Sequence, residues 1–165
     1  EKQMLSSWSI GNLSSDPSLR ERLISMGSLD AMAKIFLDTR NLETRLDLIQ
    51  TVSWAICMLI RDIQLKEFEY FHEVISVAFR YMMYQNIEIT QKEEIIWLLS
   101  SFSSAKINFD EQILNTFELG SFIGLIEIFR NEGNYSMLFA SISFLSNIIA
   151  CKSDFGKDHI KILIR

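Results

Sequence analysis

Apolar residues recur along this chain at the three- and four-residue intervals of an α-helix. In the first third of the chain, the pattern predicts a short helix over residues 19–26, a second over 28–37 and a longer one over 42–61. Gly27 separates the first two, where a residue with positive φ lets a chain turn sharply. The order is therefore short helix, turn, helix, longer helix.

The last third of the chain repeats this plan. The pattern predicts helices over residues 111–118, 121–129 and 135–150. Gly120 is expected to end the first of them, and Gly133 to separate the second from the third. Two regions far apart in sequence therefore carry the same succession of elements, which indicates an internal repeat.

Four segments of the chain resemble one another and mark the repeat. Counted from Trp8, Trp54, Trp97 and Ser143, they lie 46, 43 and 46 residues apart. This period matches the roughly 40–47 residues of HEAT and armadillo repeats. The segments are Ser7-Trp8-Ser9-Ile10-Gly11-Asn12-Leu13, Ser53-Trp54-Ala55-Ile56-Cys57-Met58-Leu59, Ile96-Trp97-Leu98-Leu99-Ser100-Ser101-Phe102 and Ile142-Ser143-Phe144-Leu145-Ser146-Asn147-Ile148.

The repeat predicts an all-α fold, a right-handed armadillo-repeat solenoid of three-helix units in which each unit buries one face on its neighbour. Because the chain begins within a helix-like segment, we expect residues 1–165 to be one armadillo segment of a longer protein. The expected units are 16–63, 64–106 and 107–153, with partial units at 1–15 and 154–165.

Composition and charge fit a globular helical protein. Hydrophobic residues make up 48% of the chain, and one proline with six glycines disfavours a many-stranded β fold. The net charge of −5 opposes general nucleic-acid binding and suits a basic partner, although a mild acidic excess is also ordinary. The uncharged run 134–151 contains Asn147 and serines, which indicates a buried helix rather than a membrane span.

Catalytic chemistry finds little support in the sequence. His72 and His159 are the only histidines, and neither lies in a metal-binding spacing. Cys57 and Cys151 are too few for a disulfide framework and suggest buried free thiols in a reducing compartment. We therefore expect neither enzymatic activity nor a metal or cofactor.

A family resemblance rests on residues of the four repeated segments. In order, they carry a Trp with an Asn four residues later and an acid beyond, a Trp followed by an Arg, a further Trp, and an Asn without a Trp. This order resembles the second to fifth repeats of the importin-α (karyopherin-α) family, whose members bind nuclear localisation signals. The resemblance covers nearly the whole chain and rests on Trp8, Asn12 and Asp16, on Trp54 and Arg61, on Trp97, and on Asn147.

The resemblance implies a peptide-binding groove. Lysine side chains of a nuclear localisation signal would lie between the tryptophans, held by apolar contact and cation–π attraction. Asn12 and Asn147 would bond to the peptide backbone, and Asp16 would pair with one ammonium group. The implied partners are basic cargo peptides and importin-β, the latter through a region outside this chain. The implied location is the cytoplasm and nucleus, with no membrane or nucleic-acid partner.

The chain also departs from the family pattern. Met58 stands where an Asn is expected, Ser101 and Ser104 where an aromatic residue and an acid are expected, and Ser143 where the family often has a basic residue. One backbone contact and one acid would be missing. An alternative hypothesis is therefore a divergent armadillo scaffold for protein–protein interaction with no transport role.

Other interpretations of the same residues remain open. A tryptophan at helical spacing is usually core, although the common register of the three favours a surface array. The two asparagines could instead bond to a neighbouring unit, and Asp16 could cap the helix that begins at Pro17. The aromatic residues between 68 and 84 are mostly expected in the core, with residues 81–84 as a possible partner surface.

Overall fold

The computed structural model describes residues 1–38, 45–62, 70–84, 87–105 and 119–150. Within these ranges the chain forms helices and no strand, so the predicted all-α class is confirmed. A short 3₁₀ turn, η2 (Ile89–Lys92), precedes α6. The α-helices are α1 (Lys2–Leu13), α2 (Pro17–Ser25), α3 (Ser28–Leu37), α4 (Leu46–Ile60), α5 (Phe71–Met83), α6 (Glu93–Ser104), α8 (Leu119–Asn131) and α9 (Tyr135–Ala150).

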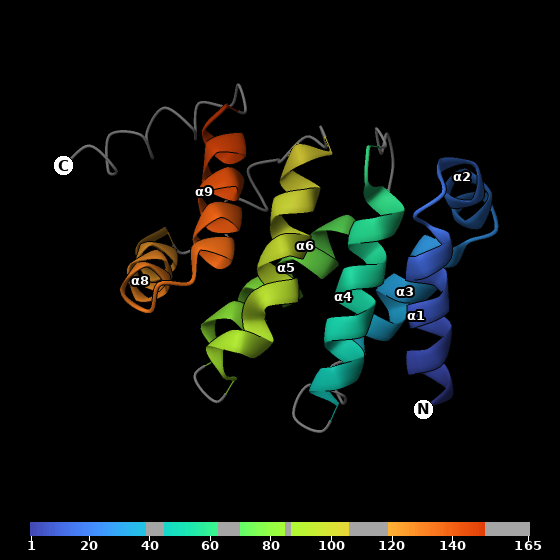
Figure 1. The fold of residues 1–165 in the computed structure, drawn as a ribbon, viewed down its shortest axis with the longest axis horizontal. Coiled ribbons are helices and arrows are strands. Elements are labelled where there is room, and N and C mark those ends of the chain that lie inside the picture. Colours follow the sequence, from blue (N-terminus) through green and yellow to red (C-terminus); the bar gives the residue numbers. More distant parts are fainter. Residues whose placement is uncertain (39–44, 63–69, 85–86, 106–118, 151–165) are drawn as a thin grey trace.

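Four helices form a row. α1 packs against α4, α4 against α6 and α6 against α9, and Figure 1 shows them side by side from right to left. These four helices contain the four repeated segments, so the sequence repeat corresponds to neighbours in space. α3, α5 and α8 each pack against the next helix of the row, and α3 also packs against α5.

The turn from α1 through α2 to α3 follows the local signals. Asp16 caps α2, accepting hydrogen bonds from the backbone N–H groups of Ser18 (2.8 Å) and Leu19 (3.3 Å), and Pro17 occupies the first helical position. Gly27 has a φ of 82°, in the left-handed region that favours glycine, and α3 begins directly after it. The predicted turn and the predicted helix 28–37 are both confirmed.

Other helix boundaries differ in part. α9 has the predicted bounds, and Gly133 before it has a φ of 70°, as a chain break there requires. α4 begins at Leu46, and the predicted start at residue 42 lies outside the described residues. α8 begins at Leu119, so Gly120 lies in its first turn and not before it. The predicted helix 111–118 is also outside the described residues.

The hydrophobic core lies between the row and the helices packed behind it. Its largest fully buried side chains include Phe36, Leu48, Ile56, Tyr81 and Phe102. Tyr81 and Met82 are completely buried, so residues 81–84 do not form an exposed partner surface; only Tyr84 is substantially exposed. None of the helices in the described ranges has both the length and the apolar character needed to cross a membrane.

Candidate functional site

The three tryptophans lie on three successive helices of the row. Trp8 is on α1, Trp54 on α4 and Trp97 on α6. Trp8 is 57% exposed, while the other two are half-buried at the edge of the core. A completely buried role is therefore excluded for all three.

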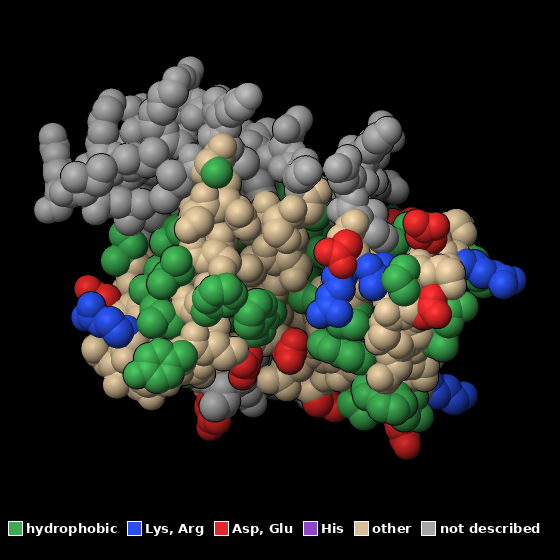
Figure 2. Space-filling model, turned by 45° about the horizontal axis from the view of Figure 1, so that its top comes forward, with side chains coloured by type: hydrophobic (Ala, Val, Ile, Leu, Met, Phe, Trp, Pro, Cys, Tyr) green, Lys and Arg blue, Asp and Glu red, His purple; other side chains and the backbone are tan. Residues whose placement is uncertain are grey.

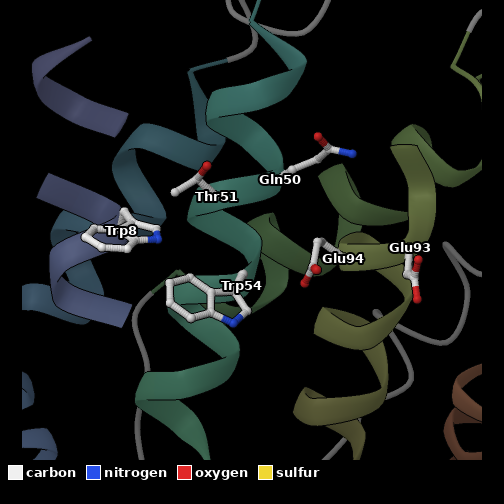
Figure 3. Close-up of a pocket in the computed structure, with 6 residues that line it drawn as sticks. All are labelled: Trp8, Gln50, Thr51, Trp54, Glu93 and Glu94. Carbon is white, nitrogen blue, oxygen red and sulfur yellow. The ribbon is translucent and has the colours of Figure 1, made fainter. Parts of the chain in front are cut away.

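A pocket of about 390 Å³ opens between Trp8 and Trp54. We call it the Trp8 pocket. Its floor and sides come from α1, α4 and the beginning of α6, as Figure 3 shows. It is lined by Trp8, Gln50, Thr51, Trp54, Glu93 and Glu94.

A second pocket of about 430 Å³, the Trp97 pocket, lies further along the row. Trp54 and Glu94 line both pockets, so the two adjoin across these side chains. Hydrophobic clusters with acidic side chains beside them are visible on the face shown in Figure 2. The Trp97 pocket is lined by Trp54, Cys57, Met58, Ile60, Arg61, Asp62, Glu94, Trp97, Ser101 and Ser104.

Trp54 is fixed by the neighbouring helix. A Cβ added to Gly11 of α1 would lie 2.7 Å from Cε3 and 2.8 Å from Cη2 of the Trp54 indole, closer than real Cβ contacts allow. Only glycine lets the ring approach the α1 backbone this closely. The wall shared by the two pockets is therefore held by packing between α1 and α4.

The acidic side chains of the Trp8 pocket come from the first turn of α6, where negative charge is favourable. Glu93 accepts a hydrogen bond from the Ser136 hydroxyl of α9 at 3.0 Å. Burial, and secondarily the charge of Glu93, raises the pKa of the Glu94 carboxyl. The sequence analysis missed both residues, because only the packing of α6 on α4 brings them beside the tryptophans.

Asn12, Asp16 and Asn147, which were expected to contact a peptide, are not among the side chains that line these pockets. The Asp16 carboxylate also accepts the Ser18 hydroxyl hydrogen bond at 2.6 Å. The hydrogen bond from the Ser18 hydroxyl has the largest effect on the pKa of Asp16. Together with the backbone hydrogen bonds from Leu19 and Ser18, it holds this pKa below its usual value. The capping role of Asp16 is confirmed, and a ligand contact stays a prediction.

The two asparagines make different contacts. Asn12 is exposed, and its Nδ2 donates to the Trp8 carbonyl oxygen at 2.9 Å within α1. Asn147 is half-buried, and its Nδ2 donates to the Ser103 hydroxyl at 3.0 Å, which ties α9 to α6. The alternative expected an asparagine to bond to the backbone of a neighbouring unit; Asn147 instead bonds to a side chain, on the neighbouring helix α6.

Arg61 lines the Trp97 pocket at the end of α4. Its carbonyl oxygen accepts a hydrogen bond from the buried guanidinium of Arg20, which also donates to the Ser14 carbonyl at 2.8 Å. Asp62 follows with a φ of 59°, unusual for a residue other than glycine, and lines the same pocket. The sequence analysis did not identify Asp62, which places an acid beside Arg61.

The site combines aromatic surface with carboxylates. Such a surface suits an alkylammonium group, which contacts the ring faces through its carbon chain and the carboxylates through its charge. No group of three or more His, Cys, Asp or Glu side chains among the described residues could hold a metal ion. Comparisons of the chain with protein-family models, curated proteins and solved structures found no match.

Proposed function

We propose that this chain is an importin-α-like adaptor that binds a lysine-rich nuclear localisation peptide along α1, α4, α6 and α9 and serves nuclear protein import. The observation that carries the proposal is the placement of Trp8, Trp54 and Trp97 on successive helices, around two adjoining pockets. A peptide in an extended conformation could pass from one pocket to the next and place a side chain in each.

The chemistry of the pockets favours lysine. Its aliphatic stem gains apolar contact with an indole, and its ammonium group gains cation–π attraction of roughly 0.5–1 kcal/mol at an exposed site. Glu93, Glu94 and Asp62 add carboxylates at the two pockets. The net charge of −5 attracts a basic partner over a longer range.

The proposal includes a right-handed armadillo-repeat solenoid. α2, α3 and α4 form a short helix, a turn at Gly27, a helix and a longer helix, as one armadillo unit requires. The row of repeated segments, backed by α3, α5 and α8, supports stacking of such units. The expected cargo and the expected location in cytoplasm and nucleus belong to the same proposal.

A divergent scaffold without a transport role is the second candidate. It is favoured by the Trp97 pocket, where Met58, Ser101 and Ser104 offer no amide side chain for a peptide backbone. Asn147, expected to supply one, already donates to Ser103. A scaffold partner would use the same face with apolar contacts and would not require lysine.

Titration with a nine-residue lysine-rich peptide separates the two. Trp8→Ala is the informative variant because Trp8 is exposed and its loss leaves the packing of Trp54 on Gly11 in place. We expect Trp8→Ala to weaken binding about three- to tenfold, and added salt to weaken it further.

Met26→Ala is the matched control. Met26 is 72% exposed at the end of α2, outside the row of helices, and lines neither pocket, so its truncation should leave affinity unchanged. Absence of binding at tens of micromolar peptide, or equal binding of a peptide with every lysine replaced by norleucine, would refute the transport proposal. The second result would favour the scaffold.

A further inference from the structure

Two carboxylates and two indoles line one pocket at the junction of α1, α4 and α6. In the Trp8 pocket, Trp8 and Trp54 stand on one side and Glu93 and Glu94 on the other (Figure 3). The pocket volume of about 390 Å³ is ample for one alkylammonium group, and its open mouth lets a side chain enter from a bound peptide.

The two acids have different surroundings. Glu93 receives the Ser136 hydroxyl hydrogen bond from α9, so α9 orients one carboxylate toward its position beside the pocket. Glu94 is half-buried and is shared by both pockets. Two negative charges on successive residues, one of them partly removed from water, favour a cation in this pocket.

Lys92, the basic residue that directly precedes Glu93 and Glu94 in sequence, makes its hydrogen bond outside this pocket. Lys92 is buried, and its Nζ donates to the Met82 carbonyl oxygen at 2.8 Å. Its ammonium group is therefore used to join η2 to the end of α5. Lys92 is therefore not the partner of Glu93 or Glu94.

We propose that Glu93 and Glu94, together with Trp8 and Trp54, form a subsite for one primary alkylammonium group, and that these glutamates set the preference for lysine at this position. The inference rests on the proposed peptide-binding function. It adds which carboxylates recognise the ammonium group of a lysine. Asp16, the acid expected from the sequence, is occupied as the cap of α2.

The subsite explains how the pocket would distinguish lysine from an apolar residue of equal length. The carbon chain of either side chain gains the same contact with the indoles. Only the ammonium group gains the attraction of the two carboxylates, one of which is partly shielded from solvent. An uncharged analogue would therefore bind more weakly without any change in shape complementarity.

The test uses n-butylammonium chloride, with n-butanol as its uncharged counterpart, at constant ionic strength. The chain has three tryptophans, so its nitrogen-15 spectrum should contain three indole N–H signals. We assign them with single Trp→Phe variants. Butylammonium should shift the signals of Trp8 and Trp54 more than that of Trp97, which does not line this pocket.

Charge-removing variants complete the experiment. Glu94→Gln and Glu93→Gln should each weaken butylammonium binding roughly threefold to fivefold, as expected for a partly exposed ion pair. The Trp97 signal reports that each variant is folded. Equal shifts from butanol, or unchanged affinity in both variants, would overturn the cation subsite.

The same variants separate this inference from the proposed function. Lysine-rich peptide that binds wild type and both glutamine variants equally would overturn the subsite and leave the peptide-binding function standing. Butylammonium binding that both variants weaken, with no peptide binding, would support the subsite and refute the proposed function.

Discussion

The indole of Trp54 lies so close to Gly11 on the neighbouring helix that a Cβ at Gly11 would come within 2.7 Å of ring atom Cε3. Both residues belong to repeated segments of the sequence, one on α1 and one on α4. The contact therefore joins two adjacent helices of the row and fixes the wall that the two pockets share.

Gly11→Ala should destabilise the fold. The added methyl group must displace the Trp54 ring or separate α1 from α4, and overpacking of this kind costs about 1–3 kcal/mol. Chemical denaturation followed by circular dichroism measures the change in the free energy of unfolding. Peptide affinity should also fall, because the displaced ring lines both pockets.

Gly124→Ala is the matched control for this prediction. Gly124 lies within α8, and a Cβ there would meet nothing within 4 Å. Alanine is the better helix former by about 1 kcal/mol, so this variant should be neutral or more stable. If Gly11→Ala is as stable as Gly124→Ala, the close packing of Trp54 on α1 is wrong.

Asp16→Ala should lower the thermal stability by removing the cap of α2. A loss of about 2–4 °C in Tm is expected for a chain of this size. Hydrogen bonds from Ser18 and Leu19 lower the pKa of Asp16. The contribution of its carboxylate to stability is therefore fully present at pH values above the usual aspartate pKa. It is lost as the pH falls through the lowered value.

The difference in Tm between wild type and Asp16→Ala should therefore narrow from pH 7 to pH 3. Asp16→Asn keeps a side-chain acceptor and should retain most of the stability at pH 7. Asp16→Ala should leave peptide affinity unchanged, since Asp16 lines neither pocket. A loss of peptide affinity with no change in Tm would instead assign Asp16 to the ligand.

Local signals in the sequence were sufficient for several elements. Asp16 followed by Pro17 located the start of α2, Gly27 located the turn before α3, and helical periodicity gave the bounds of α9. In each case the physical cause lies within a few residues of its effect. The spacing of the repeat also indicated which helices are neighbours, because the four repeated segments lie on helices that pack against one another.

The pocket acids could not be found in this way. Glu93 and Glu94 lie about 40 residues from Trp54 in sequence, and in the sequence pattern they are the ordinary acidic first turn of a helix. Their place beside the tryptophans results from how α6 packs against α4. The hydrogen bond of Asn147 to Ser103 likewise depends on the packing of α9 on α6, which periodicity does not specify.

Glu94→Gln should change how stability depends on pH. Burial, followed by the charge of Glu93, raises the pKa of Glu94 in the folded chain. At pH values between the pKa of Glu94 in the unfolded chain and its raised pKa in the folded chain, the folded state binds more protons than the unfolded state. Stability therefore falls as the pH rises through that interval. Glutamine has no charge to lose and removes this part of the dependence.

We expect Glu94→Gln to be equal to or slightly more stable than wild type at pH 7, by about 2 °C or less in Tm for a partly exposed group. The Tm of the variant relative to that of wild type should be lower at pH 4 than at pH 7. Thermal unfolding at both pH values gives the comparison. A variant less stable than wild type at pH 7 would show that the charged carboxylate has a stabilising partner in the fold.

Cys57 should react slowly with alkylating reagents in the folded protein. Burial raises the pKa of its thiol to about 12, with Glu94 adding to the effect and Ser101 opposing it. At pH 8 the thiolate fraction is then on the order of a thousandfold below that of a thiol with the ordinary value of 9.0. Since the thiolate is the nucleophile, the alkylation rate should fall, but by less than the thiolate fraction, because a thiolate of higher pKa is more nucleophilic.

The measurement uses iodoacetamide in a Cys151→Ser background, which leaves Cys57 as the only thiol. Rates at pH 8 are compared between native protein and protein unfolded in urea, where the thiol regains its ordinary pKa. Met58→Ala offers a control, because Met58 lines the same pocket and its truncation should admit solvent and raise the native rate. Equal rates in the native and unfolded protein would mean that solvent reaches the Cys57 thiol through the Trp97 pocket, and that burial does not raise its pKa.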